Sequence, residues 1–201
     1  MQKQEVVSVL EMNHLQIIGH GGFAKEVEAW ARKDYQCSFY VEDEYANRGA
    51  LPLSKIDPNT PAVIAIGDPS TRRRLADTLK GQKWAKLIHP TAQIIDPSTT
   101  LLMEGVIICA GVIITHDVII QEHTHVNINS TIGHNSRIGR YNTISPAVNI
   151  SGNVTTGSYV YLGTNAAIRE KVTILGNTTI GMSAVVIGNI KQAGTYVGLV
   201  K

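Results

Sequence analysis

Hydrophobic residues follow two different periodic patterns along this chain, and the pattern changes near residue 88. Before that point, apolar runs typical of strands (LQIIG, SFYVED and PAVIAIGD) alternate with helix-like stretches (FAKEVEAWARK and PSTRRRLADTLKG). Alternating strands and helices indicate βαβ units around a parallel sheet. Residues 14–87 are therefore predicted to form a βαβ domain.

After residue 88 an aliphatic residue returns at every sixth position. Fifteen positions spaced six apart run from Leu102 to Val186, and fourteen of them are aliphatic, the exception being Thr156. One repeat of six residues is too short to bury its own aliphatic side chain, so the repeats must stack. Three repeats form one triangular coil, and residues 88–201 are predicted to form a parallel β-helix.

Glycine directly follows the aliphatic residue in several of these repeats, at Gly133, Gly139, Gly163 and Gly181. Glycine adopts backbone conformations that other residues avoid. We therefore expect these four positions to supply the backbone freedom that the turns of the coil need.

Composition narrows the class of protein. The formal net charge is +2 and 17% of the residues are charged, so the chain has no basic stripe of the kind that binds nucleic acid. Its two cysteines, Cys37 and Cys109, stand far apart and outside any metal-binding spacing, which argues against a disulfide framework or a zinc site. The sequence contains no apolar run of about 18 residues and no signal-peptide core. We expect a cytoplasmic protein without membrane contact, with residues 1–13 as an N-terminal extension outside the core.

The stretch GHGGF, from Gly19 to Phe23, follows a predicted strand and opens a predicted helix. Backbone N–H groups at a helix N-terminus interact favourably with an anion. The spacing is not the full dinucleotide-binding fingerprint, because Ala24 or Lys25 stands where its last glycine is expected. Taken alone, the stretch predicts either a phosphate-binding loop or an ordinary tight turn.

A single histidine, His134, stands in the repeat segment NINSTIGHNSRIG. Most histidines in such a position are surface or turn residues. Acyl transfer from a thioester, however, needs a group that removes a proton from the attacking nucleophile, and histidine as a residue type suits this role near neutral pH. The residues alone leave both interpretations open.

These motifs together resemble a known family. The aliphatic-glycine hexads, IIGHGGFAKEVEAWAR, AVIAIGD followed by Arg72, LIHPTAQI, NSTIGHNSRIG and ISGN are similar to segments of the nucleotide-sugar N-acetyltransferases and sialic-acid O-acetyltransferases. That family includes the enzymes that acetylate the 4-amino group of a UDP-linked sugar on the way to bacillosamine. The resemblance covers about residues 14–201 and implies a Rossmann-like α/β domain followed by a left-handed parallel β-helix. It also implies acetyl-CoA as co-substrate, no metal, and a homotrimer with active sites between neighbouring β-helices.

In this family the glycine-rich loop holds the phosphates and the sugar of the nucleotide sugar. The resemblance therefore assigns substrate binding to the loop, to an acidic residue after the second strand and to the acidic residue of the IGD segment. The corresponding residues are Gly19, His20, Gly21, Gly22, Phe23, Glu42 or Asp43, and Asp68. Many relatives carry a histidine where Phe23 stands, so a hydrogen bond from that position is not carried over.

The same resemblance places His134 on the general base of the family, in a segment that begins at Asn127 or Asn129. Relatives follow this histidine with a carboxylate that orients the ring, whereas here Asn135 follows. An amide oxygen can fix the tautomer of the ring but cannot stabilise an imidazolium as a carboxylate does. A weaker base favours an amine over a hydroxyl as nucleophile, and an Asn135→Asp variant is expected to be as active as the natural protein or more active.

Three residues are predicted to contact the acyl donor. Thr143 stands where relatives often have a histidine, and its hydroxyl could bond the thioester oxygen, although an ordinary turn threonine is an equal alternative. Gly152, in ISGN, matches a glycine whose N–H meets the pantetheine arm, and Gly181 is assigned to the same ligand.

Other histidines and a run of arginines are given structural roles. His116, His123 and His125 fit no zinc-binding spacing and are expected to line coil corners near a subunit interface. The segment TRRRL, with Arg72 to Arg74, is expected to be a solvated helix face, with one arginine able to reach the nucleotide.

The predicted function is acetyl-CoA-dependent N-acetylation of the 4-amino group of a nucleotide-linked amino-deoxy sugar in bacterial surface-glycan biosynthesis. His134 acts as general base in a direct attack, and no covalent acyl-enzyme is needed because neither cysteine is placed to form one. Two alternatives stay open: O-acetylation of a sugar such as sialic acid, and a non-catalytic β-helix scaffold.

Overall fold

The computed structural model describes residues 13–201, so the predicted N-terminal extension lies outside the described residues except for its last residue. The first part of the chain contains a parallel sheet of four strands in the order β3-β2-β1-β4. Its elements are β1 (Asn13–Ile18), α1 (Gly22–Ala31), β2 (Tyr35–Val41), η1 (Asp43–Tyr45), β3 (Leu51–Pro52), η2 (Leu53–Lys55), β4 (Ala62–Ile64) and α2 (Pro69–Thr78), where η denotes a short 3₁₀ helix. This confirms the predicted α/β class of this part.

The apolar run of β1 explains its central place in the sheet. Strand β1 pairs with β2 on one side and with β4 on the other. Leu15 and Ile17 pack in one hydrophobic cluster with Val27 of α1, whereas Ile18 packs in another with Leu75 of α2. Helices thus cover both faces of the sheet, as parallel strands that are apolar on both faces require.

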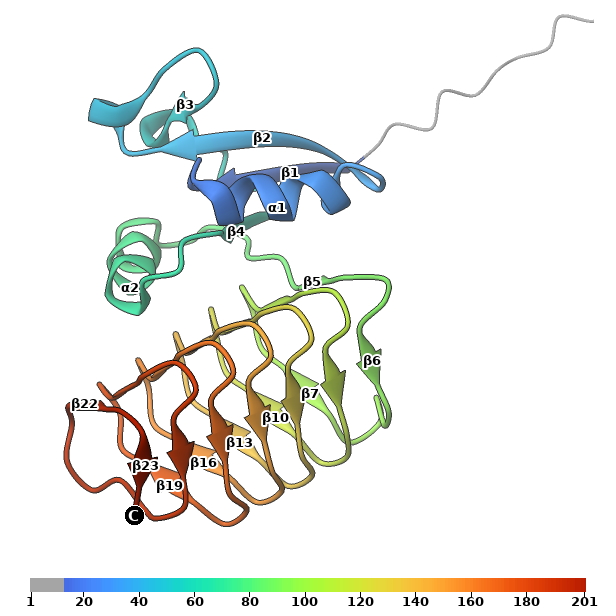
Figure 1. Ribbon diagram of the computed structural model, residues 1–201. Helices are drawn as coiled ribbons and strands as arrows, with labels where there is room; N and C mark the ends of the chain where they lie inside the picture. Colours follow the sequence, from blue (N-terminus) through green and yellow to red (C-terminus); the bar gives the residue numbers. More distant parts are fainter. Residues whose placement is uncertain (1–12) are drawn as a thin grey trace, which may run out of the picture.

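Residues 87–200 form a coil of short parallel strands that stack into three sheets (Figure 1). The first sheet contains β5 (Leu87–Ile88), β8 (Ile107–Ile108), β11 (His125–Val126), β14 (Thr143–Ile144), β17 (Tyr161–Leu162), β20 (Thr179–Ile180) and β22 (Thr195–Tyr196). The second contains β6 (Gln93–Ile94), β9 (Ile113–Ile114), β12 (Thr131–Ile132), β15 (Asn149–Ile150), β18 (Ala167–Ile168), β21 (Val185–Val186) and β23 (Leu199–Val200). The third contains β7 (Leu101–Leu102), β10 (Ile119–Ile120), β13 (Arg137–Ile138), β16 (Thr155–Thr156) and β19 (Thr173–Ile174). The left-handed parallel β-helix is confirmed.

The six-residue period places one side chain of every repeat inside the coil. Strands three repeats apart pair directly, for example Val126 with Ile144 and Ile132 with Ile150. All fifteen positions of the period are buried, including Thr156, which is 4% exposed. Burying one large aliphatic side chain contributes about 2 kcal/mol, so the stacked column is the main source of stability in the coil.

The corners of the coil use a left-handed backbone at a regular position. Every sixth residue from Gly105 to Ser183 has a positive φ, between 50° and 71°. Only two of these fourteen residues are glycine, and seven of the other twelve are Asn, Asp or His. Those three residue types tolerate this region better than most, because their short polar side chains can bond locally.

The repeat glycines have a different role from the one expected. Gly133, Gly139, Gly163 and Gly181 are not among the residues with positive φ, so their prediction as flexible turn residues was wrong. A Cβ added at Gly133 would lie 2.6 Å from the backbone nitrogen of Gly152, and one at Gly163 would lie 2.6 Å from that of Met182. Glycine is needed at these two positions because the next coil approaches too closely for a side chain.

The βαβ domain covers the first sheet of the β-helix (Figure 1). Val27 of α1 shares a hydrophobic cluster with Leu87, Ile107 and Cys109 of the coil. We call this first sheet the covered face. The corner between the second and third sheets contains His134 and lies opposite the covered face of the triangular coil; we call it the His134 corner.

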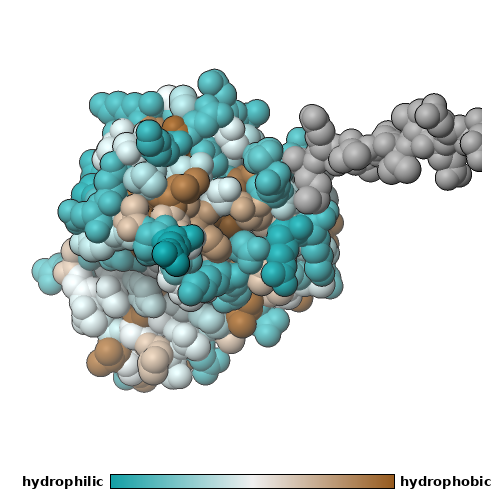
Figure 2. Space-filling model, turned by 90° about the horizontal axis from the view of Figure 1, so that it is seen from above, coloured by the Kyte–Doolittle hydropathy of each residue, from teal (hydrophilic) through white to brown (hydrophobic). Residues whose placement is uncertain are grey.

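The outer surface of the βαβ domain is mostly hydrophilic, with hydrophobic residues gathered in a small central area (Figure 2). The largest apolar surfaces of this domain are buried instead against its own helices and against the β-helix. Within residues 13–201, no helix has both the length and the apolar character needed to span a membrane.

Candidate active site

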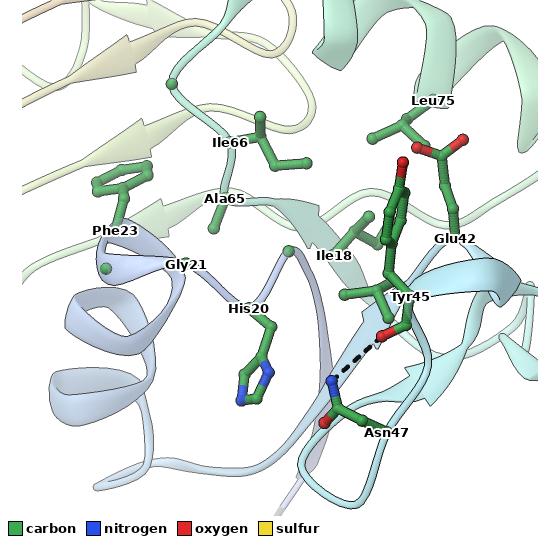
Figure 3. Close-up of a pocket in the computed structure, with 14 residues that line it drawn as sticks. Ile18, His20, Gly21, Phe23, Glu42, Tyr45, Asn47, Ala65, Ile66 and Leu75 are labelled. Carbon is green, nitrogen blue, oxygen red and sulfur yellow. Dashed lines mark hydrogen bonds between the residues drawn. The ribbon is translucent and has the colours of Figure 1, made fainter.

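A cavity of about 510 Å³ opens at the carboxyl ends of β1 and β4 (Figure 3). Open parallel sheets bind ligands at this edge, and the volume is in the range of small-molecule sites. Three loops build it, one after each of β1, β2 and β4. The lining residues are Ile18, Gly19, His20, Gly21, Gly22, Phe23, Val41, Glu42, Tyr45, Asn47, Ala65, Ile66, Gly67 and Leu75.

The loop after β1 presents bare backbone to the cavity. Gly19 has a φ of +118°, and a Cβ there would lie 3.0 Å from the carbonyl oxygen of Ala65, so this position requires glycine. A Cβ at Gly21 or Gly22 would meet nothing within 4 Å. No side chain of the described part of the chain caps α1, whose N-cap is Gly21 and whose first turn holds no acidic residue. Its first N–H groups are thus free to bind an anion.

The predicted acidic residues fall in three different places. Glu42 lines the cavity and forms a bidentate pair with Arg74, at 2.6 and 2.9 Å, which lowers the pKa of Glu42. Asp43 lies outside the lining and accepts a hydrogen bond from the backbone of Ser54. Asp68 also lies outside it and caps α2, where its carboxylate accepts the N–H of Thr71 at 2.7 Å.

Sequence reasoning missed two residues of the cavity wall, Tyr45 and Asn47. The Asn47 side chain donates to the backbone carbonyl of Tyr45 at 3.1 Å, and Figure 3 shows both beside His20 and Glu42. Their position shortly after the second strand is the signal that could have found them, since loops after parallel strands meet at one edge.

The His134 corner holds a chain of hydrogen bonds. Nδ1 of His134 lies 2.9 Å from Oδ1 of Asn135. The Asn135 amide donates to a carboxylate oxygen of Asp117 at 2.6 Å, and Nη2 of Arg137 donates to both oxygens of Asp117 at 3.0 Å. Sequence reasoning missed Asp117 and Arg137. The spacing of three repeats between positions 117 and 135 is the signal that could have found Asp117, because such residues stack on one corner.

The two glycines assigned to the acyl donor lie on different corners. Gly152 is next to His134, and a Cβ there would lie 2.6 Å from Nε2 of the histidine ring. Gly181 follows β20 of the covered face and faces Val197, whose Cγ1 would lie 2.7 Å from an added Cβ. One chain therefore brings Gly152, but not Gly181, to His134.

Thr143 lies at the junction between the βαβ domain and the coil. It is 5% exposed, and its hydroxyl donates to the carbonyl of Gly67 at 2.7 Å and accepts from Nη1 of Arg72 at 2.9 Å. The hydroxyl thereby uses its proton and one of its two lone pairs within the chain. Thr143 thus has a structural contact at the junction, and its contact with an acyl donor stays a prediction.

Arg72 corrects the expectation of a solvated arginine face. Arg73 and Arg74 are exposed, but Arg72 is fully buried. Its guanidinium bonds the hydroxyl of Thr143 and five backbone carbonyls. Those carbonyls belong to Ile66, Gly67, His123, Tyr141 and Asn142. Burial lowers the pKa of Arg72 to about 9, so the group stays charged at neutral pH.

Two of the histidines expected at a subunit interface lie under the βαβ domain instead. His123 and His125 are 4% and 1% exposed, and the ring of His125 packs on Phe23 with centroids 5.1 Å apart. Burial lowers the pKa of His123 to about 4 and that of His125 well below 6.5. His116 pairs with Asp96 at 2.8 Å on an exposed corner.

Neither cysteine is suited to carry an acyl group. Burial raises the pKa of Cys37 to about 11 and that of Cys109 to about 12, so both stay as thiols rather than nucleophilic thiolates. Among the residues that the structure describes, no group of three His, Cys, Asp or Glu side chains is arranged to hold a metal ion.

Comparisons with known proteins agree with this architecture. Residues 14–79 match the PglD N-terminal domain family. PerB from Caulobacter crescentus, solved with CoA and GDP-perosamine, is 26% identical over 92% of this chain and 94% of its own, with a TM-score of 0.82. A variant of perosamine N-acetyltransferase from the same organism is 25% identical, with a TM-score of 0.81. WeeI from Acinetobacter baumannii AYE is 27% identical over 93% of this chain and 97% of its own, also with a TM-score of 0.82.

A third structure shares the fold. It is the acetyltransferase domain of PglB from Neisseria gonorrhoeae FA1090, solved with acetyl coenzyme A, which is 23% identical over 93% of this chain and 97% of its own, with a TM-score of 0.81. The matches extend over both the βαβ domain and the β-helix. Residues 14–79 therefore match the PglD N-terminal domain, and the chain as a whole is similar in fold to solved sugar N-acetyltransferases.

Proposed function

We propose that this enzyme transfers the acetyl group of acetyl-CoA to the 4-amino group of a nucleotide-linked amino-deoxy sugar, with His134 as general base. The UDP-linked 4-amino-4,6-dideoxy type is favoured, and the product enters bacterial surface-glycan biosynthesis. The observation that carries the proposal is the exposed His134 ring, whose Nδ1 is bonded to Asn135 and whose Nε2 faces Gly152. Solved relatives with this fold bind CoA, acetyl-CoA and a GDP-linked sugar.

The proposed reaction is a direct transfer. The sugar nitrogen attacks the thioester carbon and forms the C–N bond, while Nε2 of His134 takes the proton that the nitrogen loses. Collapse of the tetrahedral intermediate breaks the C–S bond, and the proton goes to the leaving thiolate of CoA. Because both cysteines stay as thiols, a covalent acyl-enzyme is not part of the proposal.

The nucleotide sugar is proposed to occupy the cavity of the βαβ domain. Its phosphates would meet the free N–H groups at the start of α1, next to Gly21 and Gly22. Glu42, Tyr45 and Asn47 on the loop after β2 would surround the nucleoside or the sugar.

A homotrimer is proposed because one chain separates the two halves of the site. The cavity lies on the domain that covers the first sheet, whereas His134 lies on the opposite corner of the coil. A sugar held in the cavity therefore needs the His134 corner of a neighbouring copy. Gly152 of one copy and Gly181 of its neighbour, which lie on different corners, would then both line the groove for the pantetheine arm.

Sugar O-acetylation, with sialic acid as the example, is the second candidate. A hydroxyl needs a stronger base than an amine, and the direct partner of His134 is the neutral amide of Asn135. This observation favours the amine. The third candidate, a non-catalytic scaffold, does not agree with the likeness to acetyltransferases over both parts of the chain.

The test is a thiol-release assay with acetyl-CoA against UDP-, dTDP- and GDP-linked 4-amino sugars, with free sialic acid alongside. Release with one amino sugar, and none with the His134→Ala variant at equal CoA binding, is the expected result. Release only with sialic acid would establish the second candidate. Near-normal turnover by His134→Ala would show that another group is the base.

A further inference from the structure

The carboxylate absent from position 135 is present one coil earlier, at position 117. Asp117 and Asn135 both occupy left-handed corner positions, with φ of 50° and 59°, so the two side chains leave the coil on the same corner. The Asn135 amide nitrogen lies 2.6 Å from Oδ2 of Asp117. A carboxylate is thus connected to His134 through one amide.

Asp117 can only accept hydrogen bonds. Nη2 of Arg137 donates to both carboxylate oxygens at 3.0 Å, and hydrogen bonds from Arg137 and then Asn135 lower the pKa of Asp117. The carboxylate is therefore ionised at neutral pH and has no proton to donate.

This property decides which way the Asn135 amide points. The amide has one donating end and one accepting end, and the donating end must face Asp117. The accepting end, Oδ1, is then left 2.9 Å from Nδ1 of His134. Nδ1 must carry the proton to make that bond, so Nε2 holds the lone pair that a general base needs. A reversed amide would place the proton on Nε2 and remove the base.

We infer that Asp117 is a positioning residue for the acetyl transfer, which fixes the tautomer of His134 by orienting the Asn135 amide. The inference rests on the proposed function, in which His134 is the base. It also changes the expectation for Asn135→Asp. That variant would place two carboxylates 2.6 Å apart, where they repel each other.

Two other ionisable groups near the His134 corner, His116 and Asp96, bond to each other rather than to Asp117. His116, one coil before His134, pairs through Nδ1 with Asp96 at 2.8 Å, and Asp96 also accepts from Ser98 and Thr99. Asp117 thus has Arg137 as its cationic partner.

The activity test compares Asp117→Asn, Asn135→Asp and the double variant that carries both. Each single change is expected to lower kcat about tenfold, with the KM for acetyl-CoA unchanged. In the double variant, the amide introduced at position 117 can donate to the carboxylate introduced at position 135, which accepts from His134 directly. The kcat should then return to within about threefold of that of the natural enzyme. Equal kcat for Asp117→Asn and the natural enzyme, or no recovery in the double variant, would overturn the inference.

A second readout needs no acceptor sugar. In protein labelled with ¹⁵N-histidine, NMR is expected to show His134 protonated on Nδ1, and Asp117→Asn should populate the Nε2-protonated form. Asp96→Asn is the matched control, because it breaks a carboxylate–histidine pair one coil away and leaves Asp117 in place. An unchanged tautomer in Asp117→Asn would overturn the inference even if activity fell. Full activity of His134→Ala would instead contradict the proposed function.

Discussion

Nη1 of Arg72 donates a hydrogen bond of 2.9 Å to the hydroxyl oxygen of Thr143, across 71 residues of sequence. The same guanidinium bonds carbonyls of the βαβ domain at Ile66 and of the coil at Tyr141. A buried arginine whose donors are all used in this way ties the loop of Gly67, which lines the cavity, to the β-helix. The junction between the two parts of the chain is therefore polar as well as hydrophobic.

Replacing Arg72 should destabilise the protein strongly. Arg72→Leu leaves several buried carbonyls without a donor, and we expect a loss of at least about 3 kcal/mol in the free energy of unfolding. The free energy of unfolding of Arg72→Lys should lie between those of Arg72→Leu and the natural protein, because an ammonium group replaces only some of the hydrogen bonds of the guanidinium. Arg73→Leu is the control: Arg73 is exposed and pairs with Asp77, so it should cost less than about 1 kcal/mol. Urea denaturation measures all three, and equal stability of the two leucine variants would contradict the assignment.

The buried histidines should make stability fall as the solution becomes mildly acidic. The folded pKa of His123 is about 4 and that of His125 is lower than 6.5, whereas both take up a proton near pH 6.5 when unfolded. Above pH 6.5 both histidines are neutral in both states and do not change the free energy of unfolding with pH. As pH falls from 6.5 towards 4, the unfolded state takes up protons that the folded state does not, so the free energy of unfolding decreases by up to about 1.4 kcal/mol per pH unit for each histidine.

Thermal unfolding at several pH values tests this dependence. The variant His125→Leu should show a shallower loss of stability between pH 6.5 and 4.5 than the natural protein. His14→Gln, at the exposed start of β1, should keep the natural slope. An unchanged slope in His125→Leu would mean that His125 becomes protonated within the folded protein.

A methyl group at position 152 should impair catalysis without unfolding the coil. In Gly152→Ala the new Cβ would lie 2.6 Å from Nε2 of His134, and the ring is a side-chain end that can move aside. A base displaced by about 1 Å typically costs about 100-fold in rate, so kcat should fall by about that factor. The control is Gly194→Ala, where the nearest atom is 3.8 Å away. Normal kcat in Gly152→Ala would place the reacting nitrogen elsewhere.

A negative charge at the start of α1 should weaken nucleotide-sugar binding specifically. A Cβ at Gly22 meets nothing within 4 Å, so Gly22→Asp should fold normally, and an acidic residue there suits the helix. Repulsion of the phosphates should raise the KM for the nucleotide sugar at least about tenfold and leave the KM for acetyl-CoA unchanged. Gly22→Asn, of the same shape without the charge, should change little. Equal effects of the two variants would argue against phosphate at this helix end.

Mixing two impaired variants should restore activity if the site is shared between copies. His134→Ala lacks the proposed base and Gly22→Asp binds the nucleotide sugar weakly, yet a mixed oligomer contains some sites with an intact His134 from one copy and an intact cavity from its neighbour. Dissociating and reassociating the two proteins together should therefore yield more thiol release, at a nucleotide-sugar concentration below the KM of Gly22→Asp, than the two proteins give separately. Failure to complement, with mixed oligomers verified by mass spectrometry, would mean that each chain works by itself.

The resemblance pointed to His134 as the proposed base but could not supply its surroundings. His134 and Gly152 were both placed by motif, and the structure brings them together on one corner. Thr143 was placed by the same reasoning, and the structure adds that it lies under the βαβ domain, where its hydroxyl bonds Arg72 and Gly67. A motif match identifies a residue's position along the coil, but it does not identify the residues that pack against it.

The sequence by itself determined the two-part architecture and the interior of the coil. A period of six can be satisfied only by stacking repeats, and the column from Leu102 to Val186 is buried as that argument requires. The repeat spacing stacks Asp117 and Asn135 on one corner, but the tertiary structure alone decided the hydrogen bond between them, the burial of Arg72, and the separation of the cavity from His134. These features depend on which polar groups meet across a corner or a domain junction. Hydrogen bonds between residues 18 or 71 positions apart leave no trace in a local hydrophobic pattern.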